Sequence, residues 1–285
     1  GAWGVKVTEE DVDTPYGKTH LITAGNRENP PLVLFHGVGD DSALMWLLNA
    51  RGLSRHFHLI AVDTMGGPGK SEPNGVYYQE FEQAKWIDAI LAEKGLDRVY
   101  LTGVSNGAYL TQLYTAKRPE RVIKAVCMAG SIAVKGTKSP IWRMMQVFLP
   151  EAMFPSQANA RKLIKKMSGD PVVIDGIIEE HPVFLEHYVH LLKHFNNRAM
   201  FYHKIEGFDE REIAIIREKT RILIGACDRL SCHSDAVESL KQHRMDFKMV
   251  ENAGHALNME KAEWVNGEIA AFLLGDETAE GAAVS

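Results

Sequence analysis

The sequence is poor in cysteine and lacks any long apolar run. Its 285 residues include three cysteines, Cys127, Cys227 and Cys232. Three are too few for a disulfide framework, so we expect a reducing, cytoplasmic location, with Cys127 a buried strand residue. No apolar run approaches the roughly 20 residues that a membrane-spanning helix requires. The sequence therefore predicts no membrane span.

An excess of positive charge is also absent. The chain carries 32 basic and 37 acidic residues, which gives a formal net charge of -5. This balance argues against nucleic acid or an anionic membrane as a partner. Apolar residues make up 45% and charged residues 24% of the chain, as in ordinary globular proteins. The length is enough for one large domain or two ordinary ones.

The most informative stretch is 103–107, which reads Gly-Val-Ser-Asn-Gly. It lies between an apolar run at 99–101 and a segment with helical spacing at 108–114. Strand, tight turn and helix are the setting in which Gly-x-Ser-x-Gly forms a nucleophile elbow. The flanking glycines allow close packing around Ser105, whose side chain is then presented above the sheet edge at a helix N-terminus. The alternative is an ordinary turn, but the strand–helix context favours the elbow.

Apolar runs alternate with helical patterns along the chain. We predict strands at residues 3–8, 18–23, 32–35, 58–62, 98–103, 122–127, 221–226 and 246–250. Helical spacing covers 79–94 and also follows the elbow as far as Pro119. This alternation predicts a mostly parallel, eight-stranded α/β sheet flanked by helices. In such sheets functional residues collect at the carboxyl ends of the strands.

One long segment, residues 131–215, interrupts the alternation. It holds apolar, Met-rich patches separated by prolines, which predicts several short helices inserted as a lid over the strand ends. Its Met and aromatic side chains could line an adaptable apolar pocket or only attach the lid to the body. Residues 1–130 and 216–275 would then form one discontinuous core. Residues 276–285 lack an apolar pattern and are expected to fray.

A serine hydroxyl needs a base, and a histidine base needs a carboxylate that holds its tautomer. His255 follows the last predicted strand, and Asp228 follows the strand at 221–226. Both residues should therefore emerge at the same sheet edge as Ser105. The order Ser105, Asp228, His255 is the one expected for this architecture. The sequence predicts a catalytic triad.

A tetrahedral intermediate also needs N–H donors directed at its oxygen. The backbone N–H of Asn106, directly after the predicted nucleophile, would be one. The loop 36–39, His-Gly-Val-Gly, follows a strand and should supply the second, with the Val38 backbone N–H favoured. His36 itself is interpreted as a structural loop residue.

Together these motifs resemble the α/β-hydrolase superfamily over nearly the whole chain. The residues that carry the resemblance are His36-Gly37, Asp63 with the segment 66–71, the elbow, the segment 225–228 and Gly254-His255. Within the superfamily the chain is most similar to capped bacterial carboxylesterases of the naproxen-esterase type, through stretches at 17–20, 30–37 and 252–260. The resemblance implies hydrolysis of a small apolar acyl ester through an acyl-enzyme, with no cofactor.

Three other patterns suggest bound groups, and we favour none of them. The segment 64–71 nearly matches a phosphate-binding loop, but it starts with Thr64, and Pro68 removes a backbone donor. A second pattern is a set of three lid histidines, which fits a polar lid face better than a metal site. The third is a loose zinc-like cluster. The lid histidines are His187, His190 and His194, and the zinc-like cluster is Cys227, Cys232 and His233.

Two classes of function remain open. The first is a hydrolase with real turnover of carboxylic esters. The second is a ligand-sensing module that keeps the triad but signals through lid movement and a partner protein. Thioester, lactone and carbon–carbon bond hydrolysis use the same machinery, and the sequence does not separate them from ester hydrolysis. The complete triad favours the hydrolase.

Overall fold

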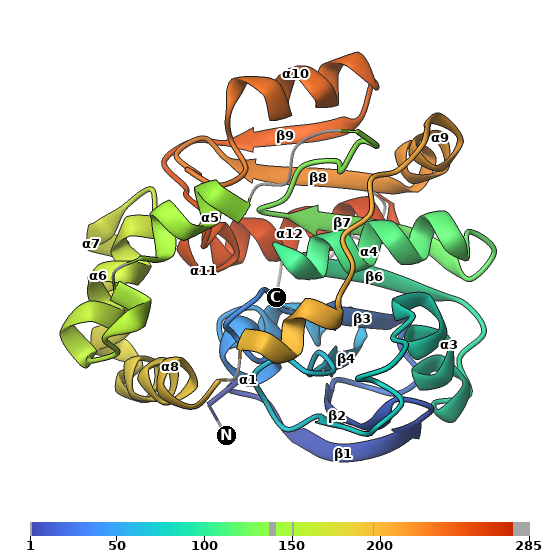
Figure 1. The fold of residues 1–285 in the computed structure, drawn as a ribbon, viewed down its shortest axis with the longest axis horizontal. Helices are drawn as coiled ribbons and strands as arrows, with labels where there is room; N and C mark the ends of the chain where they lie inside the picture. The colour runs from blue at the N-terminus through green and yellow to red at the C-terminus, as the bar shows by residue number, and fades with distance from the viewer. Residues whose placement is uncertain (1, 137–140, 150, 196, 276–285) are drawn as a thin grey trace.

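A single twisted sheet organises the fold (Figure 1). The computed structural model describes residues 2–136, 141–149, 151–195 and 197–275. The strands are β1 (Val7–Thr14), β2 (Gly17–Ala24), β3 (Pro31–Phe35), β4 (His58–Val62), β5 (Glu72–Pro73), β6 (Val99–Val104), β7 (Val122–Met128), β8 (Thr220–Gly225) and β9 (Asp246–Val250). Their order is β1-β2-β4-β3-β6-β7-β8-β9, with β5 paired to β2. Pairs involving β2 are antiparallel and all the others are parallel, which confirms the predicted mostly parallel α/β sheet.

The start of the sheet differs from the prediction. The first strand lies at Val7–Thr14 rather than at 3–8, because a tight hairpin pairs Thr14 with Gly17 and sets the register back to Val7. Trp3 instead packs into the core, and its indole N–H donates to the Ala43 carbonyl oxygen at 2.8 Å. The two-residue strand β5 was not predicted; it pairs with the start of β2 across the hairpin.

Helices cover both faces of the sheet (Figure 1). Those of the body are α1 (Ser42–Met45), α2 (Ala50–Leu53), α3 (Gln83–Glu93), α4 (Asn106–Lys117), α9 (Glu210–Lys219), α10 (Ser234–Gln242), α11 (Leu257–Glu260) and α12 (Ala262–Leu274). The buried strand β3 explains the two layers. Its Val33 and Phe35 side chains pack in the cluster that contains α3, whereas Leu32 and Leu34 pack in the cluster that contains α12. The continuous apolar run of β3 therefore contributes side chains to two hydrophobic clusters.

The segment 131–215 contributes helices between β7 and β8. They are α5 (Ile141–Phe148), η1 (Glu151–Met153), α6 (Gln157–Met167), α7 (Pro171–Glu180), α8 (Pro182–His194) and η2 (Asn197–Tyr202). Pro171 and Pro182 each occupy the first turn of a helix, where the missing N–H costs nothing. An isolated parallel bridge joins Val134 to Phe208, so the outgoing and returning chains meet. We propose that this bridge is the base of the lid, which leaves α9 with the body.

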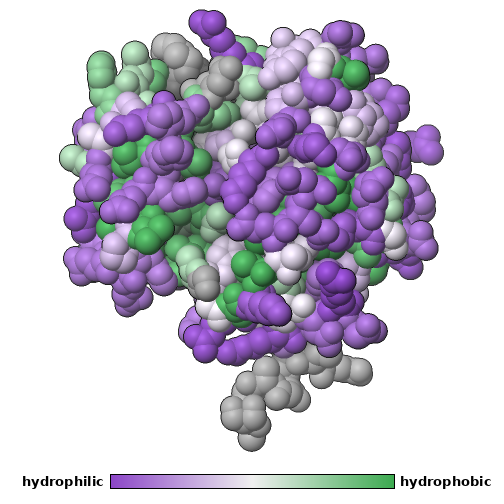
Figure 2. All heavy atoms as spheres, turned by 90° about the horizontal axis from the view of Figure 1, so that it is seen from below, coloured by the Kyte–Doolittle hydropathy of each residue, from purple (hydrophilic) through white to green (hydrophobic). Residues whose placement is uncertain are grey.

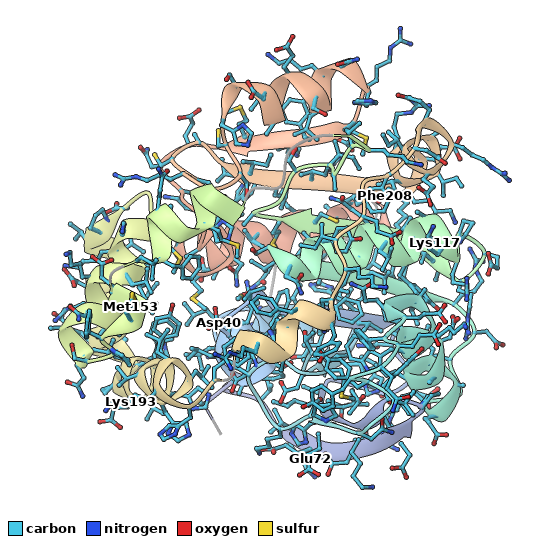
Figure 3. All side chains as sticks on the ribbon, in the orientation of Figure 1. Asp40, Glu72, Lys117, Met153, Lys193 and Phe208 are labelled. Atoms are coloured by element: carbon cyan, nitrogen blue, oxygen red, sulfur yellow. The ribbon has the colours of Figure 1, made fainter. Side chains whose placement is uncertain are left out.

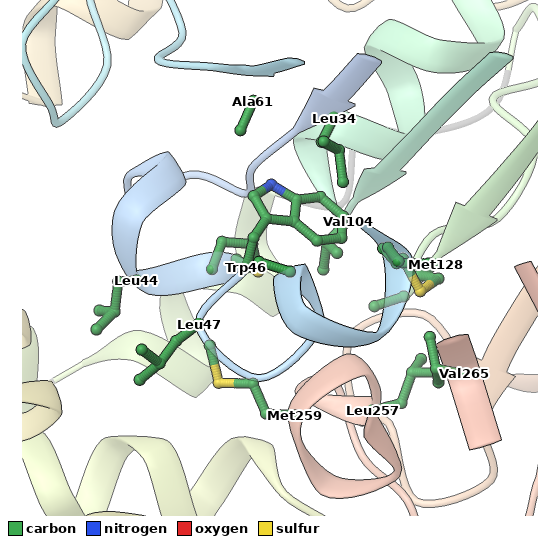
Figure 4. Packing of buried hydrophobic residues seen from close by; sticks show 14 of the residues in the cluster. Leu34, Leu44, Trp46, Leu47, Ala61, Val104, Met128, Leu257, Met259 and Val265 are labelled. Atoms are coloured by element: carbon green, nitrogen blue, oxygen red, sulfur yellow. The ribbon is translucent and has the colours of Figure 1, made fainter. Parts of the chain in front are cut away.

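The lid helices share a hydrophobic core with the body. Ile164, Ile174 and Tyr188 belong to the same buried cluster as Trp46 and Leu257. Figure 4 shows the body side of this cluster around Trp46, with Leu44 of α1 and Leu257 of α11 among its labelled residues. The face drawn in Figure 2 is mostly hydrophilic, with small separate apolar patches. Across the described residues, no helix combines the length and apolar character needed to cross a bilayer.

Candidate active site

Ser105 lies between the end of β6 and the start of α4, at the turn expected of a nucleophile elbow. Its backbone angles are φ 57° and ψ -113°, a combination that is costly for any residue with a side chain. The flanking glycines explain how the turn closes. A Cβ atom on Gly103 would overlap the carbonyl group of Gly107, and a Cβ on Gly107 would overlap the carbonyl oxygen of Phe35. Only glycine fits at either position.

The loop after β3 runs beside this serine. A Cβ atom added to Gly37 would lie 3.3 Å from the Ser105 Cβ atom. Val38 is the next residue of this loop, and Asn106 is the first residue of α4. Both predicted oxyanion donors therefore belong to segments that adjoin Ser105. Their role as donors stays a prediction.

His36 is held by the backbone through both ring nitrogens. Its Nδ1 atom donates to the Gly37 carbonyl oxygen at 2.8 Å, and its Nε2 atom accepts from the Thr64 N–H at 2.8 Å. The side chain is 1% exposed. These bonds leave no ring nitrogen for proton transfer and fit the structural role expected from the sequence.

Asp228 and His255 form a hydrogen-bonded pair. The Nδ1 atom of His255 donates to Oδ2 of Asp228 at 2.9 Å. The other carboxylate oxygen, Oδ1, accepts from the N–H groups of Leu230 at 2.8 Å and Ser231 at 3.1 Å. With Nδ1 occupied as a donor, Nε2 is the ring nitrogen that remains to accept a proton.

The environment of Asp228 favours its ionised form. The residue is 1% exposed, and burial alone would raise the pKa of its carboxyl group. The attraction and hydrogen bond of His255, together with the two backbone donors, outweigh burial and lower that pKa. An ionised Asp228 holds His255 in the tautomer that a general base requires.

Backbone hydrogen bonds connect the serine turn to the Asp228 loop across two strands. The Ser105 N–H donates to the Met128 carbonyl oxygen at 2.9 Å, at the end of β7. The N–H of Ala129, the residue after Met128, donates to the Leu223 carbonyl oxygen in β8 at 3.0 Å. The Ser231 hydroxyl then donates to the Ala129 carbonyl oxygen at 2.8 Å. The three predicted triad residues therefore follow parallel strands whose carboxyl ends lie at one edge of the sheet.

A second histidine–carboxylate pair, in which the carboxylate is buried and the histidine half-buried, connects the body to the lid and was not predicted. His187 of α8 donates through Nε2 to Oδ2 of Asp41 at 2.6 Å, and Asp41 also caps α1. The hydrogen bond to Asp41 raises the pKa of His187. Burial alone would raise the pKa of the Asp41 carboxyl group, but the hydrogen bond and the charge of His187 outweigh burial and lower it.

Asp40 stands beside this pair, near the centre of the view in Figure 3. Its Oδ1 atom is buried and without a hydrogen-bond partner among the described residues. Burial, followed by repulsion from Asp41, raises the pKa of Asp40 to about 8. The raised pKa favours the protonated form of Asp40, which lies directly after the loop that holds Val38. A pair of adjacent acids in that position is the sequence feature that could have indicated this environment.

The glycine-rich segment 64–71 closes on a carboxylate and leads into a strand. The Lys70 N–H donates to Oδ2 of Asp63 at 2.8 Å. Gly69 has φ 110°, and a Cβ atom there would overlap the Asp63 carboxylate. The next element is the short strand β5 rather than the helix that a phosphate-binding loop requires. The segment 64–71 therefore does not have the geometry of a phosphate-binding loop.

The histidine and cysteine patterns serve other contacts. Within the described ranges, no group of three His, Cys, Asp or Glu side chains could hold a metal ion. The rings of His190 and His194 have centroids 4.5 Å apart and are tilted by 38° to each other, whereas His187 is bonded to Asp41. His233 caps α10, since its Nδ1 atom accepts from the Ala236 N–H at 3.2 Å. Cys127 is fully buried in β7, as predicted, and burial raises the pKa of its thiol to about 12.

Comparisons with known proteins agree with this architecture. A family model described as alpha/beta hydrolase fold matches residues 30–166. Carboxylesterase YbfK of Bacillus subtilis is 26% identical, with 96% of this chain and 90% of that protein aligned. A 2-hydroxy-6-oxo-2,4-heptadienoate hydrolase of Pseudomonas putida is 27% identical over 74% of this chain and 75% of its own.

Solved structures show that the similarity extends over nearly the whole fold. The crystal structure of naproxen esterase (carboxylesterase NP) from Bacillus subtilis has a TM-score of 0.76 at 23% identity and covers 95% of this chain and 93% of that chain. The chain has the α/β-hydrolase fold. In sequence it is similar to bacterial carboxylesterases.

Proposed function

We propose that this chain is a serine hydrolase that cleaves carboxylic esters through an acyl-enzyme. Ser105 is the nucleophile, His255 the general base and Asp228 the acid that orients it. The observation that carries the proposal is the 2.9 Å bond between His255 Nδ1 and Asp228 Oδ2, at the same sheet edge as a serine with φ 57°. The similarity to carboxylesterases supports the choice of esters.

Acylation begins when the Ser105 Oγ atom attacks the ester carbonyl carbon while His255 Nε2 takes the hydroxyl proton. The negative charge that develops on the carbonyl oxygen is stabilised by the backbone N–H groups of Val38 and Asn106. Collapse of this intermediate breaks the bond to the alkoxy group, which leaves as the alcohol after it receives the proton from His255.

Deacylation repeats these steps with water as the nucleophile. His255 removes a proton from the water, whose oxygen attacks the acyl carbon, and then returns that proton to Ser105 as the acid is released. Asp228 stays ionised throughout and stabilises the imidazolium form of His255. The proposed reaction uses side chains, backbone and water, and it requires no cofactor.

The proposed substrate is a small acyl ester with an apolar acyl group. The lid contributes apolar residues to the cluster that reaches the strand ends, including Ile174 and Tyr188. An apolar pocket at the boundary between lid and body would bind the acyl group by burial and leave specificity to a few polar groups. Localisation in the cytoplasm stays a prediction.

A fluorophosphonate probe tests the nucleophile directly. We expect one covalent adduct, located at Ser105 by mass spectrometry, and none in a folded Ser105→Ala variant. A panel of esters with graded acyl lengths should then show multiple turnovers in the presence of a chelator. Labelling at another serine would remove the assignment, and release that stops near one equivalent for every ester would favour the ligand-sensing alternative.

A carbon–carbon bond hydrolase is a second candidate, because a relative at 27% identity is named as a 2-hydroxy-6-oxo-2,4-heptadienoate hydrolase. Adding a vinylogous 1,5-diketone to the ester panel separates the two. Turnover of the diketone with a higher kcat/KM than every ester would reassign the substrate and retain the triad.

A further inference from the structure

The loop that carries His255 is packed directly against the turn between lid helices α6 and α7. The His255 N–H donates to the Met167 carbonyl oxygen at 2.7 Å. A Cβ atom on Gly254 would overlap that same carbonyl oxygen, and a Cβ on Gly169 would overlap the Ala253 backbone. Two backbones approach this closely only where both lack side chains.

Glu260 joins the two segments through one carboxylate. It is 7% exposed and ends the short helix α11, five residues after His255. Its Oε2 atom accepts from the Gly254 N–H at 2.7 Å. Its Oε1 atom accepts from two lid N–H groups, those of Gly169 at 2.7 Å and Asp170 at 2.9 Å. One side chain therefore accepts hydrogen bonds from a buried donor on the His255 loop and from two part-buried donors on the lid.

We propose that Glu260 is a positioning residue that couples the lid to the general base. It holds the backbone at Gly254, next to His255, and the α6–α7 turn as one unit. Displacement of the lid at this turn is then transmitted to the His255 loop. The importance of this coupling for turnover rests on the proposed function, whereas the coupling itself rests on the bonds of Glu260.

The chemistry of the contact requires a carboxylate at this position. Three N–H donors face two oxygens, so both oxygens must be acceptors. A glutamine in the same place would present its NH2 group to an N–H donor on one side, either at Gly254 or at the lid turn. Loss of that bond leaves a buried or part-buried N–H donor without its acceptor, which is costly even though the side chain keeps its shape.

The coupling can be measured without turnover by amide hydrogen exchange in Glu260→Gln. We expect faster exchange in both segments, 167–170 and 253–256, relative to the wild-type protein. We also expect kcat to fall by about tenfold to a hundredfold with KM nearly unchanged, because a small displacement of a catalytic group has an effect of that size. Exchange that rises in neither segment or in only one, or a kcat within twofold of wild type, would overturn the proposal.

A change on the lid side gives an independent test that leaves Glu260 intact. Gly169→Ala should accelerate exchange at 253–256 and lower kcat, because its Cβ atom displaces the Ala253 backbone. Gly176→Ala is the matched control, since a Cβ at this lid position in α7 meets nothing within 4 Å. Equal exchange and equal kcat in the two variants would overturn the proposal.

These experiments also separate failure of the coupling from failure of the proposed function. If the wild-type protein hydrolyses no substrate but both segments exchange faster in Glu260→Gln, the proposed function falls and the coupling is supported. If the wild-type protein turns over ester and the two segments respond independently, the coupling falls and the function remains.

Discussion

The Nδ1 atom of His255 lies 2.9 Å from Oδ2 of Asp228, although the two residues come from loops after different strands. The pair leaves Nε2 as the ring nitrogen of His255 that can accept a proton, and under the proposed function it gives a specific expectation for each partner. The carboxylate should matter through its charge as well as its shape, because an amide in its place can stabilise the wrong tautomer of the imidazole.

Asp228→Asn should reduce kcat by about 10⁴-fold while the protein stays folded, as the corresponding change does in a serine protease. Steady-state kinetics of the purified variant measure the loss, and circular dichroism checks the fold. Asp235→Asn is the matched control, because Asp235 is exposed in the first turn of α10. Near-normal turnover in Asp228→Asn together with a large loss in Asp235→Asn would identify Asp235 as the acid instead.

Ser105→Gly should make the protein more stable by about 1 kcal/mol, because glycine adopts a positive φ without the strain of a side chain. Ser105→Ala keeps the Cβ atom and therefore the strain, so it serves as the control. Both variants should be inactive. Urea denaturation gives the free energy of unfolding; equal values for the glycine and alanine variants would show that the turn stores no strain at this residue.

Asp40→Asn should stabilise the protein increasingly as the pH rises from about 4 to 8. The folded protein keeps the Asp40 proton up to its raised pKa of about 8, whereas the unfolded chain releases it near the ordinary value of 3.8. The wild-type protein therefore loses stability across this window, and asparagine, which does not ionise, removes the loss. Unfolding free energies of the two proteins at several pH values should diverge; parallel curves would contradict the raised pKa.

His187→Gln should lower stability at acidic pH and have little effect at alkaline pH. The bond to Asp41 raises the pKa of His187, so the contribution of the pair is fully present below the ordinary histidine pKa and is lost as the pH rises through the raised value. Asp41 remains ionised in this window because its own pKa is lowered, and Asp63 also favours the protonated imidazole.

His190→Gln is the control for this change, because His190 is an exposed residue on the same helix. Chemical denaturation at about pH 5.5 and about pH 9, on either side of the ordinary histidine value, gives the comparison. A destabilisation in His187→Gln that is the same at both pH values would show that the bond to Asp41 acts without the charge on the histidine.

The sheet and the positions of the candidate residues follow from local patterns in the sequence. Buried runs such as 32–35 identify the strands, and strand order places the loops after β6, β8 and β9 at one edge. Asp228 and His255 could therefore be predicted to lie near each other. The first strand was misplaced because its position is set by the hairpin at Thr14 and Gly17 rather than by its own apolar residues.

Contacts between lid and body could not be predicted in this way. The His187–Asp41 bond joins residues 146 positions apart, and the bond from Gly169 to Glu260 spans 91 positions. Both bonds depend on how the amphipathic lid helices pack against the body. Helical periodicity alone does not determine this packing. Glu260 lies within a stretch that carries the family resemblance, yet only its partners reveal what its carboxylate does.

The bridge between Val134 and Phe208 has an evolutionary consequence. Because the inserted segment leaves and returns through paired residues, its length and helix content can change with little entropic cost at the sheet. A recombination event could exchange the whole insertion between relatives without moving the strand ends that precede Ser105, Asp228 and His255. Such an exchange would succeed only if the new segment again supplied a turn with two N–H groups for Glu260. This one contact therefore limits which inserted segments are compatible with the rest of the fold.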